Sequence, residues 1–241
     1  MTVIALGAVK GAPGVSTTTL ALASAWPASR DVVVAEADPD GGVLAIRWHL
    51  QPEPGMVTLA TAIRSGRGAL PAHTHVIGAG VRALVAPPAA EQVRAALSVA
   101  GDALALAFAR GDEDVLADCG RLTTTSPAIA ICQHADMTLL MLRPRIDEVV
   151  VARHRVAALR QVGVDPSLLL VRDGPYQRDE VATAVEAPVI GEIPFDRRAA
   201  QALDDHSGRA PSGRSPLLRS ARHLAEALIA PSLALRAGGH G

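Results

Sequence analysis

Residues 9–19 read VKGAPGVSTTT and follow an apolar run with the composition of a β-strand. The glycines at positions 11 and 14 would let backbone amides approach an anion, because glycine adopts dihedral angles that other residues avoid. A helix beginning near Ser16 would direct the positive end of its dipole at the same point. The stretch therefore predicts a phosphate-binding turn, although an ordinary strand–turn–helix connection uses the same residue types.

Short apolar, β-branched runs alternate with longer Ala-, Leu- and Arg-rich segments along the rest of the chain. We expect strands at 2–9, 31–36, 81–86, 114–118, 137–142, 167–172 and 188–192. Helical patterns fall at 16–26, 56–65, 89–109, 147–162, 178–186, 197–205 and 215–230. This alternation is typical of a three-layer α/β fold with a mostly parallel sheet of about seven strands and helices on both faces. We predict one domain over residues 1–235 and a disordered tail at 236–241.

The overall charge does not favour a nucleic acid or a membrane surface as a partner. The formal net charge is -1, so no excess of positive charge favours nucleic acid or an anionic membrane. Two cysteines far apart in sequence, Cys119 and Cys132, fit a reducing compartment, and we expect a cytoplasmic protein. Lys10 is the sole lysine among 23 basic residues, and it lies inside the candidate phosphate loop.

Several stretches, in the same order along the chain, resemble the ParA/MinD-type ATPases, and GMVTLATAIRSG and VRALVAPPAAEQVRAAL resemble their CpaE/TadZ-like branch. KGAPGVSTTTLALASAW looks like their deviant Walker A loop, usually K-G-G-x-G-K-[ST]-T, and VVVAEADPDGG resembles their second strand and first switch. DVLADCG places an acid at the Walker B position, and APVIGEIPFDRR is similar to the closing element beside the base. The resemblance covers essentially the whole chain and implies a P-loop NTPase fold.

The resemblance also implies roles for individual residues around ATP or ADP and Mg²⁺. Lys10 would reach across a sandwich dimer to the partner's nucleotide, and Asp38 would orient the attacking water. Magnesium would be held by Ser16, Asp38 and Asp118. The nucleotide would be bound by Lys10, Gly11, Ala12, Pro13, Gly14, Val15, Ser16, Thr17, Arg172, Asp173, Pro194, Phe195 and Asp196.

The sequence departs from the family pattern at positions that would contact the phosphates and the adenine of the nucleotide. Val15 stands where the loop lysine would bind phosphate oxygens, and Arg172 or Asp173 stands at the adenine-reading asparagine. Losing one charged hydrogen bond costs about 1.5–3 kcal/mol, or roughly 10- to 150-fold in affinity. Lys10, from its own or a partner subunit, or an arginine from elsewhere could replace the charge. The sequence does not choose among these.

Two functions follow from these observations. The first is an ATP-binding switch that dimerises to localise a protein partner in division, pole or pilus, or segregation machinery, with weak or absent hydrolysis. The alternative is a nucleotide-independent pseudo-ATPase scaffold on the same fold, which Val15 favours. A metabolic enzyme on this fold is a weaker third interpretation, because no substrate motif is found.

Three further features allow a structural or a functional interpretation. Glu36 either pairs with Asp38 in the site or is a structural acid. The arginines around helix 147–162 would permit non-specific DNA binding, but a solvated face is the preferred interpretation. The apolar stripe of 215–230 could meet a membrane surface, but we expect it to dock on the domain's own core.

Overall fold

The computed structural model describes residues 1–11, 14–78, 80–203 and 215–237. Within these residues eight strands form one sheet, in the order β3-β4-β2-β5-β1-β6-β7-β8. All neighbouring strands are parallel except β3 and β4. The strands are β1 (Val3–Ala8), β2 (Val32–Glu36), β3 (His75–Ile77), β4 (Val81–Leu84), β5 (Asp114–Arg121), β6 (Met137–Leu142), β7 (Ser167–Arg172) and β8 (Val189–Pro194).

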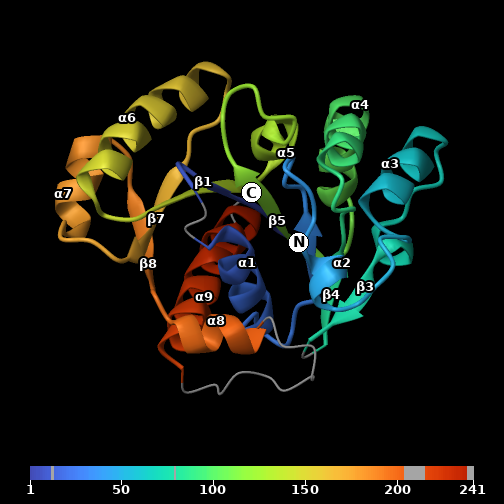
Figure 1. Ribbon diagram of the computed structural model, residues 1–241, viewed down its shortest axis with the longest axis horizontal. Coiled ribbons are helices and arrows are strands. Elements are labelled where there is room, and N and C mark those ends of the chain that lie inside the picture. The colour runs from blue at the N-terminus through green and yellow to red at the C-terminus, as the bar shows by residue number, and fades with distance from the viewer. Residues whose placement is uncertain (12–13, 79, 204–214, 238–241) are drawn as a thin grey trace.

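The helices cover both faces of this sheet (Figure 1). On one face lie α1 (Val15–Ser24), α2 (Leu44–Arg47), α8 (Arg197–Leu203) and α9 (Pro216–Ala237). The other face carries α3 (Met56–Arg64), α4 (Ala90–Phe108), α5 (Ile129–His134), α6 (Ile146–Gln161), α7 (Arg178–Val185) and the 3₁₀ turn η1 (Leu70–His73). The predicted three-layer α/β architecture is confirmed.

Strand side chains alternate between two apolar cores, one on each face of the sheet. On β1, Ile4 and Leu6 enter the core beneath α1 and α9, whereas Val3 and Ala5 enter the core beneath α4 and α6. Because both faces are covered, every strand position can be apolar, which explains the uninterrupted apolar runs of the sequence.

Several short elements were not predicted. The additional strand β3 has three residues, pairs antiparallel with β4 at the sheet edge and contains two polar or exposed positions. Helices α2 and α5 have four and six residues, too few for a helical period to stand out. Helix α2 matters for the site because it follows the loop that carries Asp38.

The C-terminal helix docks on the domain as expected. Leu217, Ala221 and Leu224 are buried in the same core as α1. Helix α9 continues to Ala237, so the first two residues of the predicted tail are helical, and 238–241 lie outside the described residues. None of the helices in the described part of the chain is both long and apolar enough to cross a membrane.

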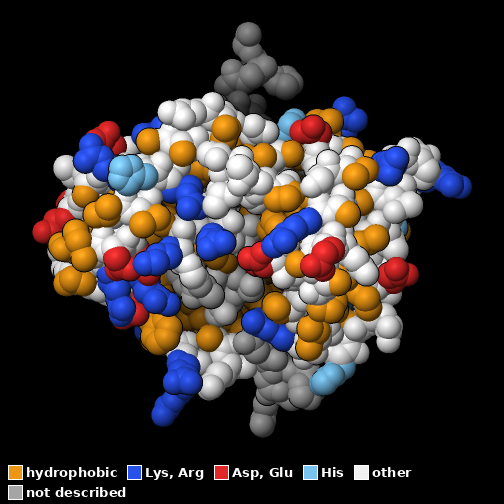
Figure 2. Space-filling model, turned by 45° about the horizontal axis from the view of Figure 1, so that its top comes forward, with side chains coloured by type: hydrophobic (Ala, Val, Ile, Leu, Met, Phe, Trp, Pro, Cys, Tyr) orange, Lys and Arg blue, Asp and Glu red, His pale blue; other side chains and the backbone are white. Residues whose placement is uncertain are grey.

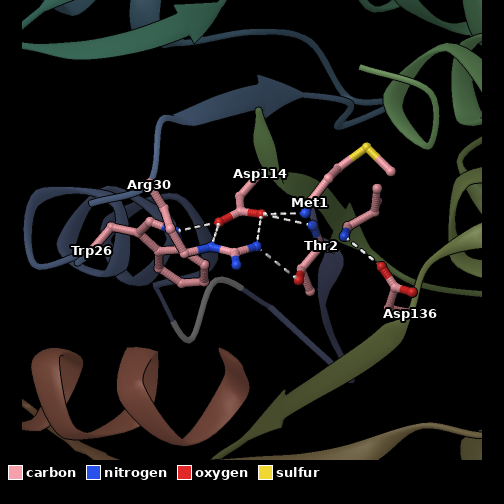
Figure 3. A network of polar contacts seen from close by, with 7 residues as sticks. Met1, Thr2, Trp26, Arg30, Asp114 and Asp136 are labelled. Carbon is pink, nitrogen blue, oxygen red and sulfur yellow. Dashed lines mark hydrogen bonds and ion pairs between the residues drawn. The ribbon is translucent and has the colours of Figure 1, made fainter. Parts of the chain in front are cut away.

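A buried carboxylate fastens the amino ends of β1 and β5 to the segment after α1 (Figure 3). Asp114 accepts hydrogen bonds from the Thr2 amide at 2.7 Å and from the Trp26 indole at 2.8 Å. Each of its two carboxylate oxygens also accepts a hydrogen bond from a nitrogen of the Arg30 guanidinium. Burial alone would raise the pKa of Asp114, but the hydrogen bonds from Arg30 and Trp26 hold it below its ordinary value. This network holds the strand ends opposite to the candidate site.

Candidate functional site

The loop after β1 has the backbone conformation expected of an anion-binding turn. Gly11 and Gly14 have φ of 39° and 91°, and Gly14 is the N-cap of α1. Among the described residues no side chain caps this helix, so the amides of its first turn face the loop. A side chain at Gly14 would be strained, because positive φ is costly for other residues. Ala12 and Pro13, two predicted loop residues, lie outside the described residues.

The sheet order brings the two predicted aspartates to this loop. Strands β2 and β5 lie next to one another and β5 lies next to β1, so Asp38 and Asp118 emerge at the carboxyl edge beside the loop. The loop and the two aspartates line a cavity of about 340 Å³. Its lining residues are Ala8, Gly11, Gly14, Val15, Ser16, Thr17, Asp38, Asp40, Arg47, Asp118, Gly120 and Arg121.

Ser16 and Asp118 form the innermost polar pair of the cavity. The Ser16 hydroxyl donates to a carboxylate oxygen of Asp118 at 2.5 Å, and the Gly120 amide donates to the other oxygen at 3.0 Å. Burial raises the pKa of Asp118 to about 6, although both hydrogen bonds oppose that rise. A hydroxyl and a carboxylate in contact match the hard oxygen ligands that Mg²⁺ takes.

Asp38 is half-buried and turned into the same cavity. Burial raises its pKa, and the amide of Asp40 donates to it at 2.9 Å. No group of three or more His, Cys, Asp or Glu side chains suited to a metal occurs among the described residues. The Ser16 hydroxyl and the carboxylates of Asp38 and Asp118 are hard oxygen donors, and they fit a magnesium ion that also takes ligands from phosphate and water.

Gly120 is a site residue that the sequence reasoning missed. It has φ of +59°, and a Cβ built there would lie 2.2 Å from the carboxyl carbon of Asp38. The signal in the sequence was the glycine two positions after the Walker B acid. Glycine at this position lets the end of β5 lie against the Asp38 side chain.

Glu36 proves to be a structural acid. It is 2% exposed, and one carboxylate oxygen accepts the amides of Val43 at 2.6 Å and Leu44 at 2.8 Å. The other oxygen accepts the Ala86 amide at 2.9 Å, and burial raises the pKa of Glu36 to about 7. Glu36 thus ties the loop that follows Asp38 to the segment just past β4. These contacts support the interpretation of Glu36 as a structural acid over a role in the site.

Two residues of the loop bear on the positive charge of the site: Val15, which lacks the expected charge, and Lys10, which carries one. Val15 is 6% exposed and packs with Leu6 and Ala8 in the core, so the loop lysine position is an apolar wall. Lys10 lies on the surface, with its ammonium 3.0 Å from Asp147 at the start of α6, and it is not among the cavity residues. The Lys10 ammonium is thus engaged with Asp147 at the surface and lies outside the cavity.

A second cavity of about 120 Å³ lies beside the loop, and Gly14 and Thr17 line both cavities. The predicted base-bordering residues Pro194, Phe195 and Asp196 line it. Phe195 is 64% exposed, an unusual position for a large apolar ring.

Arg172 and Asp173 line neither of these two cavities. Arg172 pairs with Glu192 at 3.4 Å, and Asp173 pairs with Arg145 at 2.8 Å, all at the surface. Val171, the residue before Arg172 on β7, does line the second cavity, so these ion pairs turn the next two side chains to the surface beside it.

Four of the five arginines around α6 are paired with acids, and the fifth, Arg155, donates to the carbonyl oxygen of Leu122. Ion pairs join Arg143 to Glu148, Arg145 to Asp173, Arg153 to Glu186 and Arg160 to Asp165. Figure 2 shows basic and acidic side chains interspersed over the face that it presents. This pairing supports the solvated-face interpretation over a stripe for DNA.

No protein-family model matches the sequence, and no curated protein matches it. Solved structures do match. A ParA family ATPase from Chlorobium tepidum TLS has a TM-score of 0.76 at 17% identity, with 93% of this chain and 97% of that chain covered. The chain has the ParA/MinD fold. Septum site-determining MinD of Pyrococcus horikoshii OT3, complexed with Mg-ADP, gives 0.73 at 18% identity and covers 96% of this chain and 97% of its own.

The ParA/MinD fold is also found in the MinC:MinD cell division complex of Aquifex aeolicus. That match has a TM-score of 0.69 at 15% identity, with 95% of this chain and 96% of that chain covered. Similarity at this level of identity establishes the fold alone. The function must be argued from the cavity.

Proposed function

We propose that this chain is a nucleotide-dependent switch that binds ATP or ADP with Mg²⁺ and dimerises to localise a protein partner. The observation that carries the proposal is the 340 Å³ cavity, in which an uncapped helix start, a hydroxyl and two carboxylates meet. A scaffold that had no use for phosphate would have no need to keep Gly11 and Gly14 at positive φ around an open cavity.

Each predicted residue has a role consistent with its position. The amides around Gly11, Gly14 and Thr17 would donate to phosphate oxygens. Ser16 and Asp118 would hold magnesium, which when bound neutralises charge on the phosphates. Asp38 would accept a hydrogen bond from the attacking water, and its raised pKa suits a group that must take up a proton.

We expect hydrolysis to be slow. Val15 supplies no charge to the transferring phosphoryl group, whose transition state depends on electrostatic stabilisation. Lys10 is well placed to act in a dimer, because it is exposed and its ion pair with Asp147 is also exposed. Exposed pairs are weak, so Lys10 can exchange Asp147 for a phosphate of the facing subunit.

A protein partner for this chain is supported by analogy with a chain of the same fold. MinD of Aquifex aeolicus forms a cell division complex with MinC. The analogy supports the kind of partner without identifying it.

The pseudo-ATPase scaffold remains the second candidate. It is favoured by the apolar wall at Val15 and by the ion pairs that occupy Arg172 and Asp173. In that case the dimer would form without nucleotide.

Calorimetric titration with Mg-ATP and mass measurement in solution separate the two candidates. The switch predicts saturable binding, a shift from monomer to dimer with ATP, and weaker binding by Ser16→Ala. Lys10→Ala should bind nucleotide as a monomer but fail to dimerise. Absence of binding at millimolar ATP, with an unchanged mass, would establish the scaffold instead.

A further inference from the structure

The cavity carries a charge problem that the loop does not solve. Three carboxylates, those of Asp38, Asp40 and Asp118, line it, and Val15 provides no cation. A polyphosphate would add several negative charges, of which one magnesium ion offsets two. A further source of positive charge within the cavity is therefore required.

We propose that Arg121 and Arg47 supply the positive charge for nucleotide phosphate that Val15 does not. They are the basic residues that line the cavity within the described part of the chain. This inference rests on the proposed function and assigns the phosphate contacts of that site to two arginines of the same subunit.

The end of β5 places Arg121 next to the loop. The register between β1 and β5 shifts after Leu6, so that Arg121 lies opposite Ala8, the last residue of β1. The shift coincides with the positive φ of Gly120. Arg121 is exposed, and a long side chain there can follow a phosphate that enters the cavity.

Arg47 approaches the cavity from a different element. It is the last residue of α2, and the start of this helix is held by the hydrogen bonds that the Val43 and Leu44 amides donate to Glu36. The side chain is partly buried. Arg47 and Arg121 thus reach the same cavity from two segments, one after β2 and one at the end of β5.

The electrostatics are consistent with this assignment. Burial is the largest effect on Asp118 and Asp38 and raises the pKa of both carboxyls. The charge of Arg47 opposes this rise at Asp118, and the charge of Arg121 opposes it at Asp38. Arg121 also lies near a second guanidinium: Arg155, whose pKa is lowered by burial and then by Arg121. An anion beside Arg121 would relieve this repulsion between like charges.

Arginine suits the task. Its planar guanidinium can donate two parallel hydrogen bonds to a phosphate, which a lysine cannot do. The chain otherwise uses arginine almost wholly as its basic residue. Two arginines in these places would bring the charge to the phosphates from the rim of the cavity rather than from the helix start.

The test compares Mg-ATP dissociation constants of the full chain and its variants by calorimetry. Arg121→Ala and Arg47→Ala should each weaken binding by about tenfold or more. Arg121→Lys should recover part of the loss. Arg153→Ala removes an equal charge from an exposed pair on α6 and should change the constant by less than about twofold.

Circular dichroism of each variant establishes that it is folded. If the unaltered chain binds Mg-ATP and both arginine variants bind it as tightly, this inference is overturned while the proposed function stands. If the unaltered chain does not bind Mg-ATP, the proposed function itself fails, and the inference with it. A loss in Arg153→Ala equal to the others would show a general effect of charge and would also overturn it.

Discussion

Replacing Gly120 with alanine perturbs the closest approach in the site. The φ of +59° costs an alanine about 1–2 kcal/mol, because the left-handed region brings Cβ against the following carbonyl. The new Cβ would also lie 2.2–2.5 Å from three atoms of the Asp38 carboxyl group, whereas ordinary contact begins at 3.4 Å. Relief of the overlap requires the Asp38 carboxyl to move by roughly 1 Å, and loss of its hydrogen bond from the Asp40 amide would cost about 1–3 kcal/mol.

The two costs can be separated by unfolding in urea. We expect Gly120→Ala to lower the free energy of unfolding by about 2–5 kcal/mol, the sum of both effects. In an Asp38→Ala background the carboxyl is gone, so the same substitution should cost only the strain of about 1–2 kcal/mol. Gly163→Ala is a matched control, since Gly163 has φ of +82° and no atom within 4 Å of its built Cβ.

A double-mutant cycle decides the outcome. Equal costs of Gly120→Ala in the two backgrounds, or a cost no greater than that of Gly163→Ala, would refute the reasoning that Gly120 is kept for contact with Asp38.

Three further predictions concern buried acids. Glu36→Ala leaves three backbone amides without their acceptor and should lower the free energy of unfolding by about 3 kcal/mol at pH 6, measured in urea. Asp118 has a folded-state pKa of about 6, raised from 3.8, so the folded state binds its proton more tightly than the unfolded state. Without metal, stability should therefore fall as pH rises from about 4 to about 6, by about 3 kcal/mol from this group, and Asp118→Asn should flatten that decline in urea titrations. Arg30→Met leaves the buried Asp114 with only the more distant amino-terminal ammonium, at 3.8 Å, as a cation and should cost about 3–5 kcal/mol, seen as a lower urea midpoint.

Each of these has a result that contradicts it. An unchanged midpoint for Glu36→Ala would mean that the loop amides find water instead. A slope of stability against pH that survives Asp118→Asn would assign the titration to another acid. Full stability of Arg30→Met would show that Trp26, Thr2 and the amino-terminal ammonium suffice for Asp114.

Local patterns were enough to predict much of the fold and part of the site. Strands β1, β2 and β6 are largely apolar, and the long helices α4 and α6 span many turns, so their signal exceeds the noise of single residues. The loop at 9–19 and the acids Asp38 and Asp118 lie at or near the ends of such strands, and parallel topology alone sends these ends to one edge. Hence the cavity could be anticipated.

What required the tertiary structure is the set of contacts between segments far apart in sequence. Glu36 accepts hydrogen bonds from amides up to 50 residues away in sequence. Gly120 at the end of β5 lies against Asp38, which follows the neighbouring strand β2, and Lys10 pairs with Asp147. Arg47 and Arg121 enter the cavity from two different segments. Side-chain periodicity records which residues are buried, but the direction of a charged side chain at a loop depends on long-range packing, which no local pattern encodes.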